Sequence, residues 1–227
     1  MSDYSAIIVT LKLALTTSVI LMLLGLPFAW WLARPSHNSI KNKIRPLIEA
    51  IVALPLVLPP TVLGFYLLIA FSPDSWLGVS WLRLTGSTLA FSFSGLVIGS
   101  LIYSLPFVIQ PLQATFAAIP QATIEVSASL GATKFQQFKQ IILPLSKPGL
   151  ISAFSLGFAH TLGEFGVVLM IGGNIQDETR VVSIAIYDHV ETLQFGEAHQ
   201  LSIILIAFSL ALLTLLYRNK NNRVGFH

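Results

Sequence analysis

Long apolar runs separated by shorter polar stretches dominate the pattern along this chain. Five of the runs have about the 20 residues that a helix needs to cross the hydrocarbon core of a bilayer. These runs cover residues 13–33, 50–71, 89–113, 148–171 and 200–217. The pattern predicts an all-α membrane protein with about five membrane-spanning helices. Because no internal repeat or flexible linker divides the chain, we expect residues 1–227 to form a single domain.

The polar stretch between the third and fourth runs has a helical pattern of its own. Pro120 suits the first turn of a short helix, and Gly131 suits a left-handed cap at its end. Thr133 and Gln136 match a capping box that would start a second helix. We therefore predict a helix-turn-helix and call residues 120–144 the polar hairpin.

The second helix of the polar hairpin carries a narrow apolar stripe. Phe135, Phe138 and Ile142 follow one another at spacings of three and four residues, and Pro144 is expected to limit the length of this helix. One interpretation is that the stripe packs on the membrane domain of the same chain. The other is that the polar hairpin docks on a separate protein.

Composition and charge narrow the class of protein. The chain is 54% hydrophobic and 10% charged, which excludes an ordinary soluble domain. Ten of the 13 basic residues flank the same ends of the predicted spans, and a side rich in Lys and Arg is normally cytoplasmic. These ten are Arg34, Lys41, Lys43, Arg45, Lys134, Lys139, Lys147, Arg218, Lys220 and Arg223. We expect the amino terminus outside, and the polar hairpin and carboxyl terminus in the cytoplasm. The net charge of +3 then reflects topology and does not indicate nucleic-acid binding.

Prolines interrupt the second apolar run. Pro55, Pro59 and Pro60 lie within ten residues of Gly64, and each proline inside a helix leaves a carbonyl group without its usual partner. Such a helix persists in a membrane only against protein or along a wet cavity. We therefore predict a broken helix that lines a pathway.

The fourth run contains an ionisable pair. His160 and Glu164 lie four residues apart on one helical face, and a charged carboxylate at mid-bilayer costs roughly 2.5–3.5 kcal/mol. We expect His160 to be the local partner of Glu164. Glu164 has two interpretations of equal weight, a place on a translocation path or gate and a structural anchor that accepts bonds from hydroxyl or backbone N–H groups.

Three blocks of sequence together resemble a known family. Glu125, Gly131 six residues later and Ile-x-Leu-Pro at 141–144 resemble the coupling loop of ATP-binding-cassette (ABC) importer permeases. Leu-Pro-Leu-Val-Leu-Pro-Pro at 54–60 and Leu-Gly-Glu-Phe-Gly at 162–166 are similar to molybdate importer permeases, with the sulfate permeases as relatives.

This resemblance implies the transmembrane domain of a type I ABC importer in a bacterial cytoplasmic (inner) membrane. The implied function is import of an oxyanion, molybdate first, by alternating access. The chain would pair with a second copy of itself, two ABC ATPase subunits and an extracytoplasmic oxyanion-binding protein, surrounded by membrane lipid. It would bind no cofactor, because ATP and Mg²⁺ belong to the ATPase subunits. The chain itself would not be an enzyme.

The resemblance also implies two groups of functional residues. The ATPase-coupling group is Glu125, Ala128, Gly131, Ala132, Phe135, Phe138, Ile141, Leu143 and Pro144. The group at the translocation path or gate is Pro55, Pro59, Pro60, Thr61, Gly64, Gly163, Glu164, Phe165 and Gly166. The broken second and fourth spans would switch between inward and outward access.

Other functions remain as alternatives. A permease for sulfate or tungstate has the same general pattern. A secondary transporter could use Glu164 to carry a proton or cation, although the polar hairpin would then have no purpose. An intramembrane enzyme is disfavoured because the chain has no His-Glu-x-x-His or Gly-x-Ser-x-Gly motif and no phosphate-binding loop.

Overall fold

The computed structural model describes residues 2–34 and 39–221, and within them all regular secondary structure is helical. The elements are α1 (Ser2–Ala33), α2 (Ser39–Val57), α3 (Pro60–Phe71), α4 (Trp76–Thr85), α5 (Phe93–Ala117), α6 (Gln121–Ser129), α7 (Lys134–Gln137), a π-helix (Phe138–Ile142), α8 (Leu143–Leu162), α9 (Gly166–Gly172), α10 (Val182–Glu191) and α11 (Phe195–Asn221).

Four helical stretches in the described residues are long and apolar enough to cross a membrane, and there are five if a bent pair of helices counts as one span. The four are Asp3–Ala33, Phe93–Ala117, Lys134–Leu162 and Phe195–Leu215. The fifth consists of α2 and α3, which meet at an angle of 111°. The predicted number of spans and the predicted break in the second are both confirmed. The bend falls at Pro59 and Pro60, where the missing N–H groups and restricted φ angles end one helix and begin the next.

The fourth run differs from its predicted bounds of 148–171. Helix α8 ends at Leu162, and Phe165 has backbone angles outside the helical region (φ −131°, ψ −62°) before α9 begins. The run is thus broken in the described structure, as the second one is. Helix α4 was not predicted at all, although Ser75 caps its start and Gly86 its end.

The expectation that Pro144 limits the second helix of the polar hairpin is wrong. Helix α7 continues through the π-helix into α8 without a gap, so this span begins at Lys134. Pro144 occupies the first turn of α8, where its ring is tolerated and its missing N–H is not needed. The wider π turn, in which the N–H of Leu143 bonds to the carbonyl of Phe138, joins the two helices.

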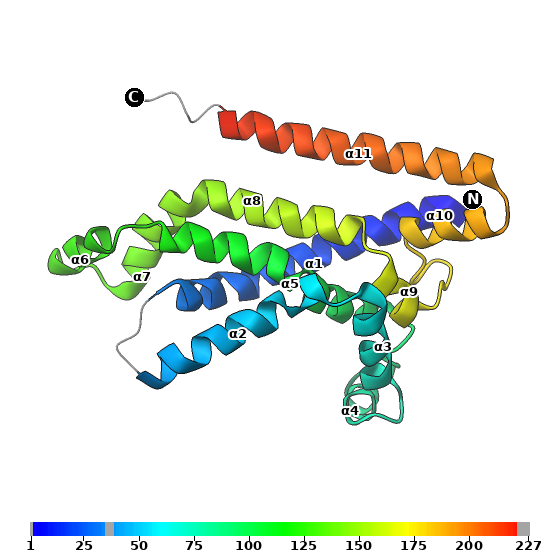
Figure 1. Ribbon diagram of the computed structural model, residues 1–227, viewed down its shortest axis with the longest axis horizontal. Coiled ribbons are helices and arrows are strands. Elements are labelled where there is room, and N and C mark those ends of the chain that lie inside the picture. Colours follow the sequence, from blue (N-terminus) through cyan, green and yellow to red (C-terminus); the bar gives the residue numbers. More distant parts are fainter. Residues whose placement is uncertain (1, 35–38, 222–227) are drawn as a thin grey trace.

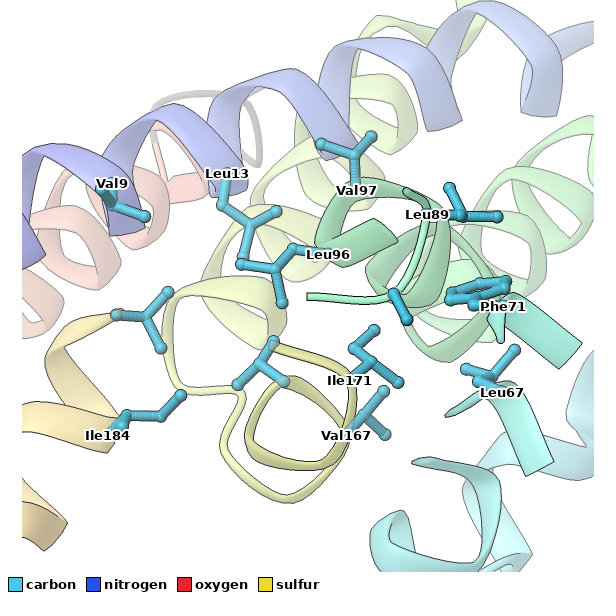
Figure 2. Packing of buried hydrophobic residues seen from close by; sticks show 13 residues of the cluster. Val9, Leu13, Leu67, Phe71, Leu89, Leu96, Val97, Val167, Ile171 and Ile184 are labelled. Atoms are coloured by element: carbon cyan, nitrogen blue, oxygen red, sulfur yellow. The ribbon is translucent and has the colours of Figure 1, made fainter. Parts of the chain in front are cut away.

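Helix α5 lies at the centre of the bundle and packs against α1, α2, α8 and α9 (Figure 1). Figure 2 shows one of two main apolar cores, in which Leu13 of α1, Leu96 of α5 and Ile171 of α9 converge. The second core joins α1, α2, α5 and α8 around Phe116, which is fully buried. Helix α11 lies along one side, and only 11% of its most apolar 18-residue stretch is buried, which leaves most of that stretch for lipid.

The polar hairpin lies at one end of the bundle, beside the end of α1 and the start of α2 (Figure 1). Helices α4, α9 and α10 lie at the opposite end. We call these the hairpin end and the opposite end. Arg223 lies outside the described residues, and the side chains of Lys41, Arg218 and Lys220 are also not described. The remaining basic residues of the predicted cytoplasmic group belong to segments at the hairpin end.

Candidate functional site

The turn of the polar hairpin is built around a left-handed glycine. Gly131 has φ +84°, a conformation that a side chain disfavours. Its N–H donates to the carbonyl of Ala128 at 2.9 Å, and the N–H of Ala132 donates to that of Ser127 at 3.0 Å. These two bonds form the Schellman motif that ends a helix. The predicted left-handed cap is therefore present.

The second helix of the polar hairpin starts at the predicted capping box. The Thr133 hydroxyl accepts from the N–H of Gln136 at 3.3 Å, and the Gln136 side chain accepts from the N–H of Thr133 at 2.8 Å. The Gln137 amide, which is buried, donates to the carbonyls of Ala132 at 3.3 Å and Ile124 at 3.5 Å. These bonds hold the two helices of the hairpin in one arrangement.

The tip of the polar hairpin exposes apolar side chains on an otherwise polar element. Val126 is 59% exposed, Leu130 83% and Phe135 71%. The coupling residues Glu125 and Ala128 are exposed as well. A rigid, largely polar hairpin that presents a small apolar face is typical of a protein-docking surface.

The base of the polar hairpin packs on its own membrane domain. Ile142 is 2% exposed, and the ring of Phe138 meets Trp30 edge-on at 6.1 Å between centroids. Both sequence interpretations therefore apply, to different residues: Phe138 and Ile142 anchor the hairpin, whereas Phe135 faces outward. Of the other predicted coupling residues, Ala132, Ile141 and Leu143 are half-buried and Pro144 is exposed.

The predicted gate residues come together where α3 meets α9. A Cβ atom on Gly166 would lie 2.7 Å from the Pro60 Cβ, and one on Gly64 would lie 2.8 Å from the Met170 Cβ. Both distances are shorter than real side chains allow. The backbone of each helix at its glycine therefore packs directly against a side chain of the other helix. The broken second and fourth spans are thus in direct contact.

A cavity of about 600 Å³ opens beside this contact. Six predicted gate residues line it, namely Pro60, Thr61, Gly163, Glu164, Phe165 and Gly166. Three others do not: Pro55 and Gly64 are buried in the packing, and Pro59 lies at the exposed bend. The remaining lining residues are Tyr103, Ala159, His160, Leu169 and Met170.

Glu164 and His160 line this cavity but do not bond to each other, so the predicted pairing is wrong. Glu164 is 4% exposed and accepts a hydrogen bond from the Ser100 hydroxyl at 2.8 Å. Within the described residues its second carboxyl oxygen is buried without a partner. Because α8 ends at Leu162, Glu164 leaves the helical face that it would have shared with His160. The expectation that Glu164 accepts from a hydroxyl group is confirmed.

His160 belongs to a separate chain of hydrogen bonds between α5 and α8. The Thr161 hydroxyl donates to the carbonyl of Gly157 at 3.0 Å. The Ser104 hydroxyl lies within hydrogen-bonding distance of both the Thr161 hydroxyl, at 2.9 Å, and Nδ1 of His160, at 2.9 Å. Phe107 also stacks on the His160 ring, with 3.8 Å between the ring centroids. The histidine is held rigidly at the cavity wall.

The contribution of α5 to this site was not predicted. Ser100, Tyr103, Ser104 and Phe107 follow the spacing i, i+3, i+4, i+7 and lie on one face of the helix. Three polar residues on one face of an apolar span are the signal that would have indicated a partner for Glu164.

Comparison with known families gives one match over most of the chain. Residues 25–222 match the family described as binding-protein-dependent transport system inner membrane component. The chain belongs to this family. The break at Pro59, the polar hairpin and the broken fourth run all lie within the matched region.

Individual transport permeases are similar to most of this chain. A molybdenum transport system permease protein, ModB, of Azotobacter vinelandii is 48% identical over 98% of this chain and 96% of its own. ModB of Escherichia coli K12 is 30% identical over 94% and 91%. The sulfate transport system permease protein CysT of Escherichia coli K12 is 32% identical over 90% of this chain and 72% of its own.

Solved structures of ABC importers share the fold of this permease. A bacterial alginate ABC transporter matches with a TM-score of 0.77 at 16% identity, over 98% of this chain and 80% of its own. The methionine transporter MetNI in inward-facing conformations matches with a TM-score of 0.70 at 18% identity, over 96% and 92%. The fold is that of a type I ABC importer transmembrane domain, as predicted.

Proposed function

We propose that this chain is the permease subunit of an ATP-driven importer of molybdate. The observation that supports molybdate as the transported ion is the 48% identity to ModB of Azotobacter vinelandii, which extends over 98% of the chain. Sulfate is the second candidate, because CysT matches at 32% identity. CysT shares only 72% of its own length with this chain, whereas ModB shares 96%, which favours molybdate.

The polar hairpin is the element through which a separate ATPase would act. Its tip exposes Val126, Leu130 and Phe135, while its base is anchored by Ile142 in the membrane core. Because the hairpin is rigid, exposed at its tip and anchored at its base, a movement of the tip would be transmitted to the membrane domain. In this proposal the hairpin end faces the cytoplasm, and ATP and Mg²⁺ are bound by the ATPase subunits.

The contact between α3 and α9 is the proposed gate. Two permease copies would enclose the path, and in each copy the cavity of about 600 Å³ beside Glu164 would open onto it. When the ATPase subunits close, the polar hairpins move together. The pair of membrane domains, which has two stable states, then changes between inward and outward access. A binding protein on the opposite side would deliver the ion.

Uptake into reconstituted vesicles tests this function. We expect vesicles that contain this permease, its cognate ATPase and its binding protein to accumulate molybdate only with ATP and Mg²⁺. Binding protein loaded with molybdate, tungstate or sulfate, presented separately, identifies the ion. Preferential accumulation of sulfate would replace molybdate as the substrate. Uptake that persists without nucleotide but follows a proton gradient would instead identify a secondary transporter.

A further inference from the structure

Two arginines at the hairpin end have an unusual set of partners. The Arg34 guanidinium stacks over the Trp30 ring at 4.2 Å and donates through Nη1 to the side chain of Gln121 at 3.1 Å. Nη2 of Arg45, on α2, donates to the carbonyls of Trp31, at 2.6 Å, and Arg34. Both side chains are therefore held at the end of α1, that of Arg34 by Trp30 and Gln121 and that of Arg45 by main-chain carbonyls.

Neither of these arginines forms an ion pair within 4 Å in the part of the chain that the structure describes. Its ion pairs within 4 Å join only Arg180 and His189 to Asp3 and Asp188, at the opposite end. The segments 35–38 and 222–227, which are not described, contain no Asp or Glu. Glu49 lies one turn after Arg45 on α2, but its carboxylate accepts from the side-chain amide of Gln113 at 2.7 Å, so neither arginine is ion-paired within the described residues.

Several donors of this pair are buried without an acceptor. Among the described residues, Nε and Nη2 of Arg34 and Nε of Arg45 have no hydrogen-bond partner. Nε and Nη2 form one edge of a guanidinium, the fork that binds two oxygens of a phosphate at once. Burial also lowers the pKa of Arg34 from its ordinary value, because the charged form loses solvation. An oxyanion placed here would satisfy the donors and offset that loss.

The surroundings favour a lipid over a dissolved ion. Trp30 and Trp31 lie in the last turn of α1, and tryptophans at the end of a span mark the level of the lipid headgroups. We propose that Arg34 and Arg45 bind the phosphodiester of an anionic phospholipid. Because Gln121 begins α6 and Trp30 contacts Phe138, the bound headgroup would also steady the polar hairpin against α1. This proposal does not depend on which ion is imported.

Native mass spectrometry of the full-length permease tests the site. The protein is prepared with phosphatidylglycerol and phosphatidylcholine in equal amounts, and retained lipids are counted. We expect selective retention of phosphatidylglycerol, falling about fivefold in Arg34→Gln and in Arg45→Gln. Lys43→Gln removes an equal charge from an exposed neighbour and should leave retention unchanged. Size-exclusion profiles and melting temperatures confirm that each variant is folded.

Three results would overturn the proposal. The first is equal retention of phosphatidylglycerol in all three variants, which would show a general charge effect. The second is arginine-dependent stabilisation by inorganic phosphate or molybdate with no retention of phosphatidylglycerol, which would assign the site to a soluble oxyanion. The third is loss of the cognate ATPase from the Arg34 and Arg45 variants with lipid retention intact, which would assign the arginines to a carboxylate of that partner.

Discussion

Replacing Gly131 by valine is expected to abolish nucleotide-driven uptake and to release the cognate ATPase from the permease. Gly131 has φ +84°, and a built Cβ meets no atom within 4 Å, so the effect of a side chain is purely conformational. A β-branched residue in this region costs about 1–3 kcal/mol, and each 1.4 kcal/mol is tenfold in an equilibrium. The Schellman turn would rearrange and move the apolar tip. Co-purification of the ATPase and uptake into vesicles measure the loss.

Gly131→Asn is the matched control, because asparagine tolerates the left-handed conformation. It should retain most of the bound ATPase and most of the uptake, although it adds a side chain at the same position. Equal loss in the two variants would mean that the backbone conformation of the turn is not what matters. Undiminished activity of Gly131→Val would contradict the role given to the polar hairpin.

The second large effect is expected at the contact between α3 and α9. Gly166→Ala would place a Cβ 2.7 Å from the Pro60 Cβ, and the proline ring cannot swing aside. Overpacking of this kind costs about 1–3 kcal/mol, here in the packing of α3 against α9. We expect uptake to fall by roughly tenfold or more while the ATPase stays bound, since the polar hairpin lies at the far end of the bundle.

Gly163→Ala separates crowding from a simple change in the cavity wall. Gly163 lines the same cavity, yet an added Cβ would meet only the carbonyl oxygen of Ala159, at 3.8 Å. It should change uptake by no more than about twofold. If both alanine variants lose uptake equally, the close approach of α3 and α9 is not the gate. Melting temperatures of the two variants show whether either loss reflects unfolding.

Much of the fold could be predicted because the decisive signals are local. Runs of about 20 apolar residues predicted about five spans, and the prolines predicted a break in the second, which the structure shows as a bend of 111°. The Schellman cap at Gly131 and the capping box at Thr133 were predicted from residue type and spacing alone. Each of these features depends on a few neighbouring residues.

The errors came from features that depend on the whole chain. Pro144 does not end its helix, because the π turn before it lets the chain continue into α8. His160 and Glu164 do not pair, because the end of α8 at Leu162 separates them and serines of α5 bind each one. Which residues of α5 face α8 depends on how the two helices are rotated, and a single sequence does not state that rotation.

Cross-linking at the hairpin tip tests most directly whether the polar hairpin transmits the nucleotide cycle. The chain has no cysteine, so single cysteines can be introduced without background at exposed Ala128 in the hairpin and, as a control, at Leu84, 84% exposed at the opposite end. We predict that Ala128→Cys forms a covalent adduct with a cysteine-bearing ATPase subunit, with a yield that changes on adding ATP, whereas Leu84→Cys forms none. An ATPase adduct at Leu84→Cys, or none at Ala128→Cys in a transporting complex, would contradict it.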